Sequence, residues 1–159
     1  KHLTTTYRPT VWDRRYEIYD KASKLLIEER EQDKNINIDS NINNNILTYL
    51  NYAAYGRFID PKAKYENLIA KEINKEVNNP KESLNKAKKL IEYLNQRALI
   101  VNNEFAHKMF LEFFTAMKIY EDIYIFDELN NKEELIHFIT KYYYDDRWEN
   151  IIKILVFLI

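Results

Sequence analysis

The chain has 159 residues, of which 46% are apolar, so one domain with a substantial core is expected. Its 24 basic and 25 acidic residues nearly cancel, which leaves no global field to attract nucleic acid or an anionic membrane. The absence of cysteine excludes disulfides and thiolate chemistry. A single glycine argues against phosphate-binding loops and nucleophile elbows, which need several.

Apolar residues recur at every third or fourth position along most of the chain, and this periodicity predicts an all-α fold. We expect a first helix over Val11–Arg30, followed by a polar, asparagine-rich loop over Glu31–Asn45. Residues 1–40 would then be an N-terminal extension with one helix, and residues 41–159 a helical bundle.

Several helix boundaries are marked by glycine and proline. A second helix is expected over Asn41–Tyr55, with Gly56 as a left-handed cap at its C-terminus. Asp60–Pro61 and Asn79–Pro80 each predict a helix start, because the amide that proline lacks is not needed in a first turn. The helix that begins at Asn79–Pro80 ends near Asn102–Asn103 or continues past it, and the sequence leaves both open.

The most apolar segment, Phe105–Phe126, predicts the central helix, since a helix that is apolar around most of its circumference is usually buried. Asn131 and Glu134 form a capping box for the next helix. Asp145 and Asp146 favour the start of the last helix by complementing its dipole. The sequence therefore predicts a single-domain bundle of about seven helices around a central hydrophobic helical hairpin.

Two Glu-x-x-His pairs, Glu104 with His107 and Glu134 with His137, have the spacing that di-iron carboxylate bundles use on one helix face. Here the pairs fall on consecutive helices, whereas that family places a further glutamate-bearing helix between them. We therefore expect solvated histidines, with no metal and no cofactor. A di-metal bundle enzyme is the third and least favoured interpretation.

Other catalytic and nucleic-acid signals are weak. The carboxylates of Glu72 with Glu76 and of Asp13 with Glu17 lie four residues apart, but each has a lysine or arginine nearby in sequence, as on a solvated helix face. The basic residues around Lys86 are interleaved with glutamates and have no aromatic platform for stacking bases. We predict that the chain is not an enzyme and does not bind nucleic acid.

Tyrosines cluster in two places, and consecutive aromatic residues on one helix cannot all face the core. Tyrosine combines a large apolar body with a polar tip, a combination that protein interfaces select. We take Tyr52, Tyr55, Tyr142 and Tyr143 as a candidate dimer or adaptor-binding face. Half-buried tyrosines at the rim of the core would give the same pattern.

Three segments resemble the poxviral Bcl-2-like family over Leu47–Ile159. Ile46–Gly56 (ILTYLNYAAYG) is similar to that family's first helix, and Lys64–Leu68 (KYENL) to its second. Phe138–Arg147 (FITKYYYDDR) resembles its penultimate helix, which runs into an Asp-Asp pair before the last helix.

The resemblance implies a non-enzymatic protein that modulates apoptosis or NF-κB signalling in the cytoplasm of an infected cell. Members of the family either bind an amphipathic pro-apoptotic helix in a groove or use flat helix faces to bind signalling adaptors and to self-associate. A groove here would be lined by Tyr65, Leu68, Ile69, Phe110 and Met117, although all five would also suit a plain core. A host protein and a second copy of the chain are the expected partners.

The alternative comes from the opening segment Trp12–Tyr19 (WDRRYEIY), which resembles the start of small bacterial helical domains that follow an N-terminal membrane anchor. In that case the chain is the cytoplasmic helical domain of a tethered structural or sensory protein. It would reach the membrane only through a segment that lies outside this chain.

Overall fold

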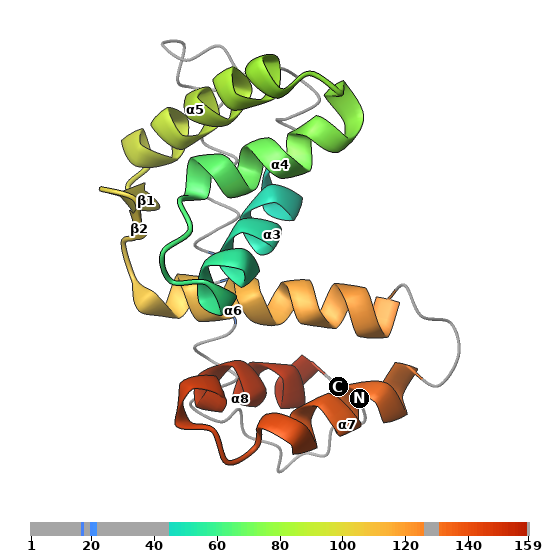
Figure 1. The fold of residues 1–159 in the computed structure, drawn as a ribbon. Coiled ribbons are helices and arrows are strands. Elements are labelled where there is room, and N and C mark those ends of the chain that lie inside the picture. The colour runs from blue at the N-terminus through green and yellow to red at the C-terminus, as the bar shows by residue number, and fades with distance from the viewer. Residues whose placement is uncertain (1–16, 18–19, 22–44, 126–130, 159) are drawn as a thin grey trace.

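The computed structural model describes residues 17, 20–21, 45–125 and 131–158 (Figure 1). Within these residues the fold is all-α, as the periodicity predicts, with six α-helices and one short hairpin. The α-helices are α3 (Ile46–Ile59), α4 (Tyr65–Val77), α5 (Pro80–Gln96), α6 (Lys108–Tyr120), α7 (Asn131–Tyr142) and α8 (Glu149–Leu158). The hairpin pairs β1 (Ile100–Val101) with β2 (Glu104–Phe105) in antiparallel register. Most of the helix expected over Val11–Arg30 and of the extension 1–40 lies outside the described residues.

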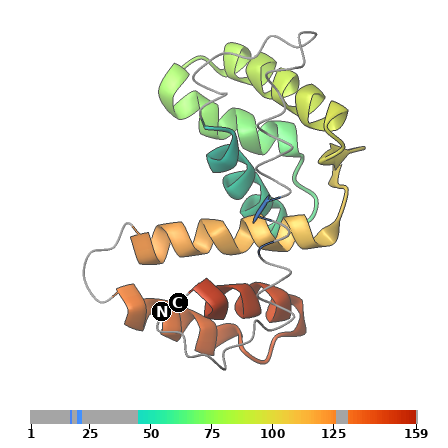
Figure 2. The same cartoon turned by 180° about the vertical axis from the view of Figure 1, so that it is seen from behind.

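A single helix, α6, crosses the middle of the fold, where the sequence analysis expected a hydrophobic hairpin. It packs against α3 on one side and α8 on the other (Figures 1 and 2). Its apolar residues explain this position, because Phe110, Phe113 and Phe114 are buried together with Ile119. The largest fully buried side chains of the core include Ile46, Leu50, Tyr65, Ile69, Leu90, Tyr93, Phe114 and Leu135.

The two Asx-Pro signals have different outcomes. Asn79–Pro80 starts α5 as predicted, and the Asn79 side-chain oxygen accepts a hydrogen bond from the Glu82 amide at 3.1 Å. The prediction for Asp60–Pro61 is wrong, because α4 begins only at Tyr65. The Asp60 carboxylate instead accepts from the Lys62 amide at 3.1 Å and closes a turn.

The prediction of Gly56 as a helix cap is also wrong. Gly56 lies inside α3, which continues to Ile59, and its φ angle is not positive. A Cβ atom at this position would lie 2.7 Å from Cδ2 of Leu68 on α4. An added methyl group would force the Leu68 side chain to shift, so glycine at this position allows α3 and α4 to approach closely.

Residues other than glycine occupy the left-handed positions of the described chain. Asn102 and Asn103, with φ of 53° and 60°, form the two-residue loop of the hairpin, where both central residues need positive φ. The sequence left open whether the helix that begins at Asn79–Pro80 ends near these asparagines or continues past them. In the structure α5 ends at Gln96, and the chain turns back through this hairpin.

Ala98, with φ of 56°, follows α5 in a Schellman arrangement. The Leu99 amide donates to the Leu94 carbonyl and the Ala98 amide to the Asn95 carbonyl, both at 3.0 Å. Ala98 thus occupies the position that glycine most often takes.

The segment predicted as one helix over Phe105–Phe126 is divided. Phe105 belongs to β2, α6 starts at Lys108, and a π-helical turn over Glu121–Ile125 follows it. Asp145 accepts from the Arg147 amide at 3.0 Å and starts a 3₁₀ turn over Asp146–Trp148 that leads into α8, close to the expected start. Among the described residues, none of the helices combines the length and the apolar composition that crossing a bilayer needs.

Candidate functional site

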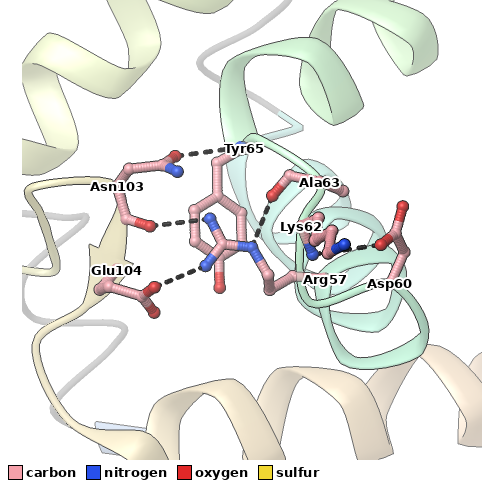
Figure 3. Close-up of polar contacts among 7 residues, drawn as sticks. All are labelled: Arg57, Asp60, Lys62, Ala63, Tyr65, Asn103 and Glu104. Carbon is pink, nitrogen blue, oxygen red and sulfur yellow. Dashed lines mark hydrogen bonds and ion pairs between the residues drawn. The ribbon is translucent and has the colours of Figure 1, made fainter.

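The guanidinium of Arg57, on α3, is a buried positive charge with three different acceptors (Figure 3). The side chain is only 6% exposed. Its Nε donates to the Ala63 carbonyl at 2.6 Å, Nη2 to the Asn103 carbonyl at 2.8 Å and Nη1 to Glu104 Oε1 at 2.9 Å. Arg57 thereby joins the α3–α4 loop to the turn of the hairpin.

Tyr65, the first residue of α4, completes this cluster. The Arg57 Cζ lies 4.1 Å from the centre of the Tyr65 ring, in cation–π geometry. The N-cap residue of α4, Lys64, makes no side-chain capping hydrogen bond. The Tyr65 amide, the first of this helix, instead donates to the Asn103 side-chain oxygen at 3.2 Å. The Tyr65 hydroxyl is buried and finds no hydrogen-bond partner among the described residues.

Burial raises the pKa of the Tyr65 phenol well above its ordinary value, and the charge of Glu104 raises it further, whereas the charge of Arg57 lowers it. The phenol is therefore neutral at physiological pH and is no candidate for a general base. Glu104, by contrast, has 68% of its side chain exposed, so one end of the Arg57 ion pair reaches solvent.

A depression of about 240 Å³ lies beside this cluster, and we call it the Arg57 depression. It is lined by Arg57, Phe58, Pro61, Glu104, Lys108, Leu111 and Arg147. The Arg147 Cζ lies 4.2 Å from the centre of the Phe58 ring. Within the part of the chain that the structure describes, neither Lys108 nor Arg147 forms an ion pair. Three positive charges and one negative charge therefore line a single small hollow.

The five residues predicted to line a groove do not lie open together. Tyr65, Ile69 and Phe110 are buried in the core, while Leu68 and Met117 are half-buried and pack against it. None of the five lines the Arg57 depression or the second depression, of about 340 Å³, which lies between the end of α5 and the hairpin.

The four predicted face tyrosines fall into two separate pairs. Tyr52 and Tyr55 are half-buried on α3, whereas Tyr142 and Tyr143 lie at the end of α7, on the other side of α6 (Figure 1). Lys75 and Lys118 approach the Tyr52 ring, with their Nζ atoms at 5.2 and 5.7 Å from its centre.

Within the second pair, only Tyr143 is strongly exposed. Tyr142 stacks on Trp148 with ring centres 4.3 Å apart, while 61% of Tyr143 is exposed. The four tyrosines therefore do not form one face.

The Glu-x-x-His pairs differ from the helical ligand pairs that their spacing suggested. Glu104 lies in β2 and binds Arg57, and His107 is the residue before α6, so these two do not share a helix. Glu134 and His137 do share α7. No three histidine, aspartate or glutamate side chains among the described residues come close enough together to hold a metal ion.

The candidate acid–base pairs are placed only in part. Glu72 pairs with Lys75 at 3.0 Å on α4, as expected of a solvated face, and Asp13 lies outside the described residues.

Two carboxylates that link helices, the buried Glu112 and the half-buried Glu121, were not predicted from the sequence. Glu112 on α6 accepts both hydrogen bonds of the Asn150 amide, at 3.2 and 3.1 Å, and so ties α6 to α8. Glu121, in the π-helical turn, accepts from the Asn51 amide of α3 at 3.1 Å. Burial raises the pKa of both carboxyl groups above the ordinary value, and the asparagine hydrogen bonds lower it in part. Glu112 therefore links α6 to α8 in the core, and Glu121 links the π-helical turn to α3.

Arg57 and Ile136 are not among the residues predicted from the sequence, and Tyr144 belongs to the second tyrosine cluster but not to the predicted face. Arg57 looked like one of many helix-surface charges, because its partners lie 6 to 47 residues away. Tyr144 and Ile136 are 92% and 47% exposed, and the run of three tyrosines at 142–144 is the sequence signal that some of these side chains face solvent.

Comparison with protein-family models, with curated proteins and with solved structures finds no match for this chain.

Proposed function

We propose that this chain is a non-enzymatic protein-binding module whose partner contacts the exposed end of α7. The observation that carries the proposal is a group of three exposed apolar side chains, Ile136, Tyr143 and Tyr144, which we call the α7 corner. Ile136 lies on α7, and Tyr143 and Tyr144 lie in the turn that directly follows its last residue, Tyr142.

The α7 corner has the composition of an interaction surface. The Tyr143 and Tyr144 rings meet edge to face, with centres 5.0 Å apart and an interplanar angle of 82°. The preceding Tyr142 stacks on the buried Trp148, which connects the start of this turn to the core. Exposed charges at Asp145, Asp146 and Arg147 follow directly, as in the polar rim of an interface.

Of the two binding modes that the resemblance implies, the flat-face mode suits these exposures better. The groove mode needs open apolar anchors, and three of the five proposed lining residues are buried. A Bcl-2-like arrangement and a role in modulating cell-death or innate-signalling proteins in a host cytoplasm belong to this proposal. They are supported by the resemblance in Ile46–Gly56, Lys64–Leu68 and Phe138–Arg147.

The experiment compares three forms of the immobilised protein: wild type, the double variant Tyr143→Ser with Tyr144→Ser, and the control Ile59→Ser. Ile59 is also an exposed apolar residue, but it lies at the end of α3. Host-cell lysate is passed over each form, retained proteins are identified by mass spectrometry, and the affinity of purified candidates is measured.

We expect a cell-death or signalling protein to bind wild type and control alike. The double variant should weaken its binding by about tenfold or more, since each interfacial tyrosine contributes roughly 1–2 kcal/mol. Partners that bind the double variant as tightly as wild type, or the absence of any specific partner, would contradict the proposal. Sedimentation of the three forms tests a second copy of the chain in the same way.

A further inference from the structure

We propose that the Arg57 depression binds a small anionic group, a carboxylate or a phosphate, that is attached to an apolar body. This site is separate from the α7 corner and goes beyond the protein-binding role proposed above. The inference combines the charge of the lining residues, the start of α6, the apolar wall and the built-in contact of Glu104.

The charge of the depression is positive in a chain whose formal net charge is −1. Arg57, Lys108 and Arg147 line it together with one carboxylate, that of Glu104. Three of the five Arg57 N–H groups donate to the partners in Figure 3, which leaves two without a partner among the described residues. Lys108 and Arg147 form no ion pair among the described residues, so only one of the three cationic groups, Arg57, is paired with a carboxylate, that of Glu104.

The start of α6 adds to this field. Lys108 is its first residue and Leu111 lies one turn later, and both line the depression. The N-cap residue, His107, makes no side-chain capping hydrogen bond; its carbonyl accepts from the Phe110 amide at 3.0 Å, which leaves the Lys108 and Met109 amides without a partner among the described residues. The positive end of the helix dipole and its amides favour an anion at this position.

The apolar wall sets the shape of the ligand. Phe58, Pro61 and Leu111 line the depression, and the Arg147 guanidinium covers the Phe58 ring. Its volume of about 240 Å³ exceeds that of a cavity known to hold one benzene molecule, about 150 Å³. One ring or short aliphatic stem with a single anionic group therefore fits.

Glu104 already shows how this site receives an anion, because its Oε1 lies 2.9 Å from Arg57 Nη1. The carboxylate is largely exposed and can move into solvent at low cost. It would compete with an incoming anion for Arg57 and repel it. Removal of the Glu104 charge should therefore strengthen anion binding, while removal of the cations should weaken it.

The test titrates the full chain with phenyl phosphate, 3-phenylpropionate and the neutral 2-phenylethanol, followed by amide NMR shifts. We expect at least one anion to shift the amides of Phe58, Lys108, Leu111 and Arg147, and the neutral alcohol to bind about tenfold more weakly or not at all. Binding of phenyl phosphate alone assigns the site to phosphates, and binding of 3-phenylpropionate alone assigns it to carboxylates. No shift with either anion, or equal binding of the alcohol, would overturn the proposal.

Variants separate a built site from general attraction to a positive surface. The double variant Lys108→Gln with Arg147→Gln should weaken anion binding about tenfold, and Glu104→Gln should strengthen it about threefold. The control Lys89→Gln removes an exposed lysine of α5 and should leave the affinity unchanged. A control that weakens binding as much as the double variant, or a Glu104→Gln variant that binds no tighter than wild type, would contradict the inference.

Discussion

Replacement of Arg57 by methionine should destabilise the fold strongly, because the carbonyls that it serves would lose a charged donor. Hydrogen bonds from the guanidinium to the Ala63 and Asn103 carbonyls, at 2.6 and 2.8 Å, contribute roughly 1.5 kcal/mol each. The cation–π contact with Tyr65, at 4.1 Å, contributes about 1 kcal/mol. Methionine recovers part of the buried apolar contact, so we expect a net loss of about 3 kcal/mol in the free energy of unfolding.

Glu104→Gln should cost far less, at most about 1 kcal/mol, because its carboxylate is 68% exposed and its ion pair is screened by solvent. The measurement is urea-induced unfolding followed by circular dichroism, with linear extrapolation to zero denaturant. Lys62→Met is the matched control, since Lys62 is exposed in the same loop and its side chain should contribute less than about 0.5 kcal/mol.

Two results would refute this account of the cluster. A loss below about 1 kcal/mol in Arg57→Met would mean that the carbonyls find other donors or water at little cost. Equal losses in Glu104→Gln and Arg57→Met would mean that the ion pair dominates and the carbonyl contacts contribute little.

Three further perturbations test the interior. Gly56→Ala should change the free energy of unfolding of the wild type little, because the added methyl group lies 2.7 Å from Leu68 Cδ2. In a Leu68→Ala background this contact is absent, so the same substitution should stabilise the chain by about 1 kcal/mol through its higher helix propensity. A double-mutant cycle in urea that shows no coupling would argue against the clash. Burial raises the pKa of Glu112, so its carboxyl group binds the proton more tightly in the native chain than in the unfolded chain. The free energy of unfolding should therefore fall as pH rises from the ordinary carboxyl pKa of 4.5 through the raised pKa of the native state. Glu112→Gln, which keeps an acceptor for Asn150, should flatten that part of the calorimetric stability profile and be more stable than wild type at neutral pH, whereas superimposable profiles would show that the group does not contribute. Tyr65→Phe should stabilise the chain by about 1 kcal/mol by removing a buried hydroxyl without a described partner, and a destabilised variant would reveal a partner for it.

Short-range signals predicted the fold where a side chain and its backbone partner are close in sequence. The Asn79 side chain accepts from the amide of Glu82, three residues later, so the start of α5 could be predicted from the local sequence. Asp60 offers the same local chemistry, but it closes a turn onto Lys62, and the sequence does not distinguish the two uses. The prediction for Gly56 failed for a different reason: its nearest contact is Leu68 on another helix, and the local sequence does not indicate that contact.

The candidate site could not be predicted because its contacts are long-range. Arg57 meets Asn103 and Glu104 from 46 and 47 residues away, and only the reversal of the chain at the hairpin brings them together. Asn102 and Asn103 carried part of that information, since adjacent asparagines tolerate the positive φ that such a turn requires. Lys108 and Arg147 lie 50 and 89 residues from Phe58 in the sequence, so no local pattern indicates the Arg57 depression.

The left-handed residue after α5 has a consequence for the denatured chain as well as for the native one. An alanine methyl at φ of 56° crowds its own carbonyl, a conformational penalty of about 1–2 kcal/mol that glycine escapes. Ala98→Gly would relieve this crowding but would also give the unfolded polypeptide more backbone freedom, which offsets roughly 0.4–1 kcal/mol of the gain. The only glycine of the chain lies where α3 approaches α4, so the left-handed position after α5 is occupied by alanine. The strain at Ala98 is therefore accompanied by a lower backbone entropy of the unfolded chain than glycine would give at this position.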